Sequence, residues 1–165
     1  MKQLDQAQQG GRTLPETEAK QKGGLRWRAA RDTAILYLAV SIGSVIGSVL
    51  RAVVSMASLA YLGPGFPWGT LFVNVLGSFV IGFYATLTEP GARIFAGTRQ
   101  RQFVMTGICG GFTTFSMFSL ETFLLVQSGN WPAAGLNIGA SIVTWLGAVW
   151  LGHMSASRLN RLGGH

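Results

Sequence analysis

Uncharged stretches recur along the chain at the length of a membrane-crossing helix. Asp32 and Arg51 enclose 18 uncharged residues, and Arg51 and Glu89 enclose 37. Arg101 and Glu121 enclose 19, and Glu121 and Arg158 enclose 36. A helix of about 20 apolar residues crosses the roughly 30 Å hydrocarbon core of a bilayer. Because a segment in lipid must satisfy its own backbone hydrogen bonds, and these stretches are about twice as long as a barrel strand, the pattern predicts helices.

We therefore expect an all-α membrane protein with four transmembrane helices, at about residues 33–55, 68–88, 102–127 and 131–154. Glycine and proline clusters at residues 63–69 and 128–132 separate the first from the second helix and the third from the fourth. Residues 1–31 contain few large apolar side chains, which predicts a disordered basic tail. The expected domains are thus the tail 1–31, a four-helix transmembrane domain 32–156 and a short basic C-terminal tail 157–165.

The composition supports a membrane protein. Only 12% of the residues are charged, against roughly 25% in soluble domains, which excludes a soluble enzyme. The net charge of +7 comes from residues that flank the apolar stretches, so we expect anionic lipid headgroups as the partner and not nucleic acid. Ten Lys and Arg residues lie near the termini and in the loop between the second and third helices, whereas the other two loops carry no charge. This bias predicts an inner (plasma) membrane protein with both termini in the cytoplasm.

The third helix contains the run Gly107–Glu121, in which two glycines and two threonines follow one another. These residues favour helix poorly, so we expect a break near Gly110–Thr114. An opened helix exposes backbone carbonyls, which suit a small hard cation such as sodium. Alternatively, the glycines permit close helix packing and the threonines bond back to the preceding turn.

Several polar or aromatic residues in the spans are candidates for an ion path. Asn74 and Thr70 are four residues apart and could donate to an anion, or Asn74 could simply join two helices. Phe115 and Phe118 share a helix face and could present positive ring edges, or they could be apolar filler.

The remaining candidates are charged or hydroxyl-bearing. Arg51 could be functional or could reach the membrane interface, and Glu121 could be a proton relay, a counter-charge or an interfacial residue. Asn137, Ser141 and Thr144 form a polar stripe in the fourth helix, which either faces an ion or makes ordinary helix contacts. The two histidines lack catalytic neighbours, and no motif of a metalloprotease, serine hydrolase or ATPase is present, so an enzyme is not expected.

Read together, these motifs resemble the Fluc (CrcB) family of fluoride channels. The resemblance rests on Gly69-Thr70, Asn74 and Gly77-Ser78, on the run from Gly110 to Ser119 with Glu121, and on the glycine-rich first helix that ends at Arg51. It covers about residues 34–155. Asn137 and Trp145 depart from the family's pattern.

The resemblance implies a passive fluoride channel, built as an antiparallel dimer with two fluoride paths and a structural, non-transported sodium ion at its centre. Carbonyls of Gly110 and Thr113 match the sodium ligands. The implied fluoride path contains Asn74, Phe115, Phe118, Thr70, Ser141, Glu121 and Arg51. The second subunit would be another copy of this chain or an oppositely oriented homologue. The alternative is a proton-coupled exporter of the small multidrug-resistance type, which would use Glu121.

Overall fold

The computed structural model describes residues 16–92 and 94–162, with side chains from residue 21 onward. The chain divides into two units, residues 1–35 and 36–165, and α1 (Glu16–Leu62) begins in the first and ends in the second. The second unit also contains α2 (Trp68–Leu87), α3 (Thr98–Gln102), the π-helix η1 (Phe103–Cys109), α4 (Gly110–Phe112), α5 (Phe115–Gln127) and α6 (Trp131–Leu162). The described residues contain no strand.

Four helical segments are long and apolar enough to cross a membrane, at Gln21–Leu62, Trp68–Leu87, Thr98–Gln127 and Trp131–Leu162. This confirms the predicted all-α membrane fold with four spans. The predicted turns are also confirmed: Gly63 (φ 75°) follows α1 and Gly129 (φ 78°) follows α5. Positive φ costs glycine little, which is why both helices end there.

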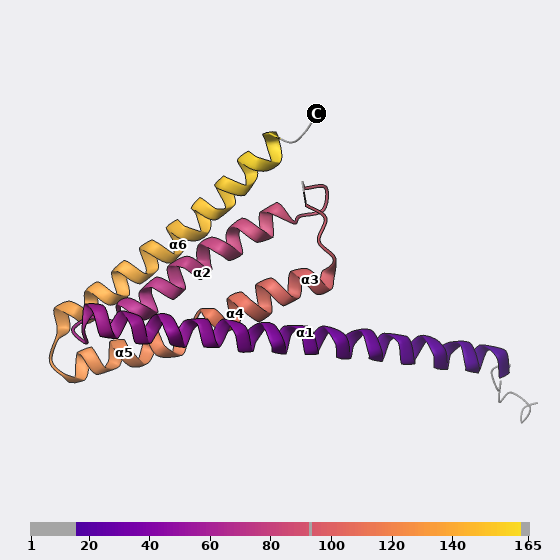
Figure 1. Ribbon diagram of the computed structural model, residues 1–165, viewed down its shortest axis with the longest axis horizontal. Coiled ribbons are helices and arrows are strands. Elements are labelled where there is room, and N and C mark those ends of the chain that lie inside the picture. The colour runs from indigo at the N-terminus through magenta and orange to yellow at the C-terminus, as the bar shows by residue number, and fades with distance from the viewer. Residues whose placement is uncertain (1–15, 93, 163–165) are drawn as a thin grey trace, which may run out of the picture. The chain divides into compact units, whose positions relative to one another are not determined.

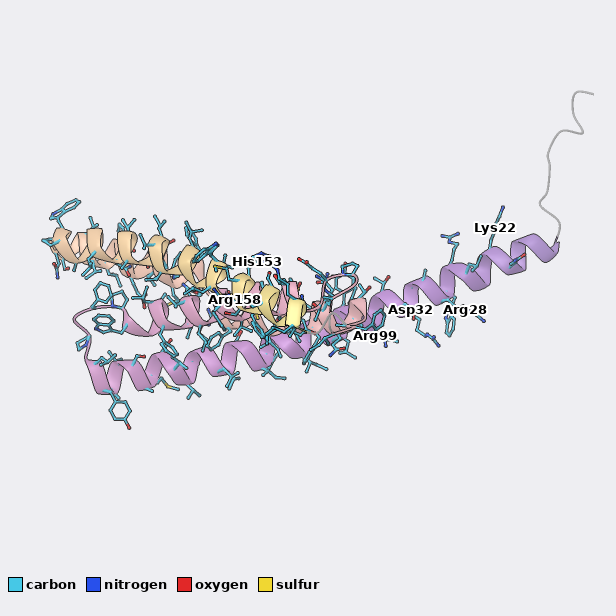
Figure 2. All side chains as sticks on the ribbon, turned by 90° about the horizontal axis from the view of Figure 1, so that it is seen from above. Lys22, Arg28, Asp32, Arg99, His153 and Arg158 are labelled. Carbon is cyan, nitrogen blue, oxygen red and sulfur yellow. The ribbon has the colours of Figure 1, made fainter. Side chains whose placement is uncertain are left out.

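The first unit differs from the expected disordered tail. Residues 16–31 belong to α1, and residues 1–15 lie outside the described residues. Glu, Ala, Lys, Gln and Arg dominate this stretch and favour helix, and a helix that is already nucleated grows by one hydrogen bond per residue. The side chains from residue 21 to 34 are exposed, and Figure 2 shows Lys22, Arg28 and Asp32 along this stretch. Low hydrophobicity correctly indicated that no core forms here, but it did not exclude a helix.

In the second unit, α2 and α6 lie side by side (Figure 1) and run in the same direction. Gly152 of α6 meets the backbone of Phe79, and Gly82 of α2 meets the backbone of Val149. Near their C-terminal ends, the Thr86 hydroxyl lies 2.8 Å from His153 Nδ1. The glycines allow the two helix backbones to approach closely.

The glycine pairs of α1 and of the third span pack against each other. A side chain at Gly43 would meet Gly107 and the Phe103 carbonyl, and one at Gly111 would meet the backbone of Ser44. In contrast, a methyl group added at Gly135 or Gly139 of α6 would have no neighbouring atom within 4 Å. The pairs Gly43/Gly47 and Gly107/Gly111, each four residues apart, therefore join helices within this chain, whereas Gly135/Gly139 does not.

The interior is small and polar, while the large apolar side chains face outward. Val73, Asn137 and Ser141 are the largest fully buried side chains among the described residues. Many leucines, isoleucines, valines and aromatic residues of the spans are exposed. This distribution is typical of a protein surrounded by lipid, where exposed apolar surface costs nothing and buried polar groups must pair.

Candidate functional site

The third span is broken where the sequence predicted. Thr113 (φ −84°, ψ 157°) and Thr114 (φ −153°, ψ 124°) are extended, between α4 and α5. A π-helix, η1, precedes the break, and the sequence pattern did not indicate it. After the break, the Thr114 side chain accepts a hydrogen bond from the Met117 N–H at 3.2 Å and so caps α5.

Asn74 of α2 holds the break open. Its Nδ2 donates to the Thr114 carbonyl at 2.9 Å, and its Oδ1 accepts from the Thr114 N–H at 2.7 Å. Both backbone groups of one extended residue are thus paired with a single amide. Because Nδ2 carries two N–H groups, one donor is left beyond the bond to Thr114.

At the break, two backbone N–H groups donate to side chains and not to the carbonyls that they would meet in a continuous helix. In such a helix, the Thr114 N–H would pair with the Gly110 carbonyl and the Met117 N–H with the Thr113 carbonyl. Here the Thr114 N–H pairs with Asn74 and the Met117 N–H with the Thr114 hydroxyl. The carbonyls of Gly110 and Thr113, which the resemblance implies as sodium ligands, are therefore among those that the break separates from their helical donors.

A cavity of about 260 Å³ adjoins the break. Its lining includes residues from four elements: Asn74 and Ser78 of α2, Gly110 of α4, Phe115 of α5 and Trp145 of α6. Gly77 also lines it, and a side chain there would meet Thr113. We call this space the break cavity.

A second cavity, of about 480 Å³, is lined by both Thr70 and Glu121. The Thr70 hydroxyl donates to Glu121 Oε1 at 2.8 Å, whereas Glu121 Oε2 is buried without a hydrogen-bond partner among the described residues. Ser55 and Ser58 of α1 add hydroxyl groups to the lining. We call this space the Glu121 cavity. Thr70 and Asn74 are one turn apart on α2, so one helix face connects the two cavities.

Three aromatic rings lie in sequence beside these cavities. The ring centroids of Phe115 and Phe118 are 5.5 Å apart, and those of Phe118 and Trp145 are 5.0 Å apart with an interplanar angle of 72°. Phe118 is buried, whereas 71% of the Phe115 side chain is exposed. The edges of such rings carry partial positive charge, which suits an anion.

The other predicted positions have more varied surroundings. Ser141 is fully buried, and its hydroxyl has no partner among the described residues. Asn137 donates to the Thr122 hydroxyl at 2.9 Å and thereby joins α6 to α5. Thr144 bonds back to the carbonyl of Ala140. Arg51 is half-buried on α1 and lines neither the break cavity nor the Glu121 cavity.

Comparison with known proteins gives the family. Residues 38–153 match the family described as CrcB-like protein, Camphor Resistance (CrcB). The chain belongs to the CrcB-like family. It is 62% identical over 134 residues to the fluoride-specific ion channel FluC 1 of Rhodopseudomonas palustris, which covers 81% of this chain and 95% of that protein. It is 55% identical over 137 residues to FluC 1 of Bradyrhizobium diazoefficiens, covering 83% and 92% of the two chains.

Membership of the CrcB-like family confirms the resemblance drawn from the motifs and the prediction that the chain is not an enzyme. The roles of single residues in this CrcB-like chain stay predictions. Sequence reasoning did not single out Ser55, Ser58 or Ser78 as lining residues, because a serine in an apolar span is equally compatible with a bond back to its own helix.

Proposed function

We propose that this chain forms a passive channel selective for fluoride. The observation that supports it best is the meeting of an uncharged donor and aromatic rings at the break: Asn74 and Phe115 line one cavity there, and the Phe118 ring lies 5.5 Å from the Phe115 ring. Fluoride is small and strongly hydrated, so a selective path must replace its water shell with groups that hold it weakly enough to release it. The relatives named as fluoride-specific channels support the same substrate.

In this proposal the Glu121 cavity and the break cavity are successive parts of the path. Thr70 and Asn74 connect them, and Phe118 and Ser141 line the apolar stretch between the helices. Arg51 contributes from its half-buried position on α1 by attracting the anion. Transport needs no ATP: hydrogen fluoride enters across the lipid in acid surroundings, dissociates in the cytoplasm, and the anion leaves down its electrochemical gradient. The channel thereby relieves fluoride toxicity.

The test is efflux from proteoliposomes that contain the purified full-length chain, recorded with a fluoride electrode. We expect efflux to begin when valinomycin lets potassium leave with the anion, and chloride efflux to stay at the level of protein-free liposomes. Efflux that requires a proton gradient would favour the exporter that uses Glu121, and the absence of fluoride efflux would contradict the channel.

We further propose an antiparallel dimer with a structural sodium ion. The carbonyls of Gly110 and Thr113 have the chemistry for it, because the break releases both from the helix ladder and oxygen ligands suit a hard cation. The described residues offer no cluster of three or more His, Cys, Asp or Glu. The ion would fix the break and stay in place during transport. The exposed ring of Phe115 is consistent with cover by a second subunit.

If sodium binds only the assembled dimer, mass action stabilises the dimer by an amount that grows with sodium concentration. We therefore expect sedimentation of the purified protein to show more dimer in sodium chloride than in potassium or N-methylglucamine chloride. Equal dimer fractions in the three salts would argue against the sodium site.

A further inference from the structure

Trp145 of α6 has a polar group that neither the family resemblance nor the packing of the chain explains. Its indole Nε1 is buried without a hydrogen-bond partner among the described residues. An indole N–H is a donor only, so its partner must be an acceptor. Leaving such a donor unpaired costs about 1–3 kcal/mol, which a leucine at this position would avoid.

A second unpaired donor lies one turn away on the same face of α6. Ser141 is fully buried, and its hydroxyl also has no partner among the described residues. Residues four apart on a helix are neighbours. Two enclosed donors with no protein acceptor among the described residues therefore occupy one patch of this helix.

Trp145 lies among residues of the candidate fluoride path. Its ring meets Phe118 in an edge-to-face arrangement at 5.0 Å, and it lines the break cavity together with Asn74 and Phe115. None of the described residues that line this cavity is charged. Donors, positive ring edges and the absence of charge in this lining make the patch attractive to a small anion and unattractive to a cation.

We propose that the indole N–H of Trp145 is a direct ligand of the permeating fluoride, which it receives together with the Ser141 hydroxyl beside Phe118. This inference rests on the proposed function and adds a binding residue to the path. A neutral donor suits the task, because a charge-assisted hydrogen bond from a neutral group replaces one water of the hydration shell without trapping the anion.

Trp145→Phe isolates the donor, since it keeps an aromatic ring against Phe118 and removes only the N–H and part of the ring. Trp150→Phe is the matched control, because Trp150 is on the same helix and is 59% exposed. We expect fluoride efflux from proteoliposomes to fall by about tenfold in Trp145→Phe, as for the loss of one charge-assisted hydrogen bond. Trp150→Phe should conduct like the unmodified protein. Unchanged or faster efflux in Trp145→Phe would overturn the proposal.

A binding measurement on the unmodified protein tests, independently of flux, whether the Trp145 indole binds fluoride. The chain has five tryptophans, so nitrogen-15 labelling of their indoles gives a short spectrum. We expect one indole resonance to move with added sodium fluoride but not with sodium nitrate, and to be missing in Trp145→Phe. No fluoride-dependent shift of the Trp145 resonance would overturn the proposal. If the shift occurs and the unmodified protein shows no efflux, the proposed channel function fails while the anion site stands.

Discussion

At the scale of single residues, the site depends on one amide more than on any charge. Asn74 pairs with both backbone groups of Thr114, forty positions away in the sequence. A buried backbone group without a partner is costly, and there is no water in the bilayer core to replace it. Asn74 therefore stabilises the conformation that releases the carbonyls of Gly110 and Thr113, and its remaining N–H faces the proposed path. In the proposed channel, one residue would thus serve both architecture and conduction.

Asn74→Ala should damage both properties. It leaves the Thr114 N–H and carbonyl unpaired, which costs about 1–3 kcal/mol for each group, and it removes a donor from the path. We expect a lower unfolding temperature in detergent and at least tenfold slower fluoride efflux.

Asn74→Asp provides the comparison. It keeps an acceptor for the Thr114 N–H but places a buried carboxylate oxygen against the Thr114 carbonyl and adds a charge that repels fluoride. Efflux should therefore fall further, and the unfolding temperature should drop at least as far as in Asn74→Ala. Both variants behaving like the unmodified protein would refute the role of Asn74 in the break and in the path.

At the scale of elements, glycine decides how closely the helices approach. Gly152 lies so close to α2 that an added methyl group would be 2.8 Å from the Phe83 nitrogen and in collision with the Phe79 carbonyl. These are backbone atoms, which cannot yield without moving a whole helix. The pair α2 and α6 carries Asn74, Thr70, Ser141 and Trp145, so its spacing would set the width of the proposed path.

Gly152→Ala should therefore destabilise the protein by about 1–3 kcal/mol, the usual cost of overpacking. Gly147→Ala is the control, because no atom lies within 4 Å of its added methyl group, and alanine favours helix by up to about 1 kcal/mol. Cys109, the single cysteine, is buried, so a thiol-reactive dye reports unfolding directly. We expect Gly152→Ala to react at lower temperature than the unmodified protein and Gly147→Ala to react at the same or a higher temperature. The reverse order would contradict the close packing of α2 and α6.

At the scale of the whole molecule, the direction in which each subunit inserts into the membrane decides which subunits can pair in an antiparallel dimer. Lys and Arg near the spans set topology, and they gather in residues 20–31, in residues 93–101 and at the end of α6. Figure 2 marks Arg99 on α3 and Arg158 on α6, which belong to these basic segments. A subunit with this bias inserts in one direction, whereas an antiparallel dimer needs subunits in both.

We therefore predict that this chain inserts with both termini in the cytoplasm and pairs with an oppositely oriented homologue. The check is a C-terminal fusion to a fluorescent protein that folds only in the cytoplasm, compared with a fusion to a phosphatase that is active only outside. We expect fluorescence and no phosphatase activity. Comparable signals from both fusions would contradict a fixed orientation and support a homodimer in the cell. Copies of this chain purified in detergent are free to pair in either direction, so efflux from the purified chain does not test its orientation in the cell.

The sequence by itself determined the fold class, the four spans, both uncharged turns and the position of the break. These properties are local: hydropathy over about 20 residues decides membrane insertion, and poor helix formers at Gly110–Thr114 open a helix wherever it lies. The same motifs, read together, also identified the family. The composition of residues 16–31 was less informative, because helix propensity and the capacity to form a core are different properties.

The tertiary structure decided which residues meet. No local pattern shows that Asn74 pairs with Thr114, that Thr70 bonds to Glu121, or that Asn137 pairs with Thr122. Each of these choices depends on which helix faces which, and that is set by glycines whose contacts come from other helices. The unpaired donors of Trp145 and Ser141 could be recognised only after every neighbouring acceptor had been placed, because an unsatisfied hydrogen bond is a property of the assembled interior.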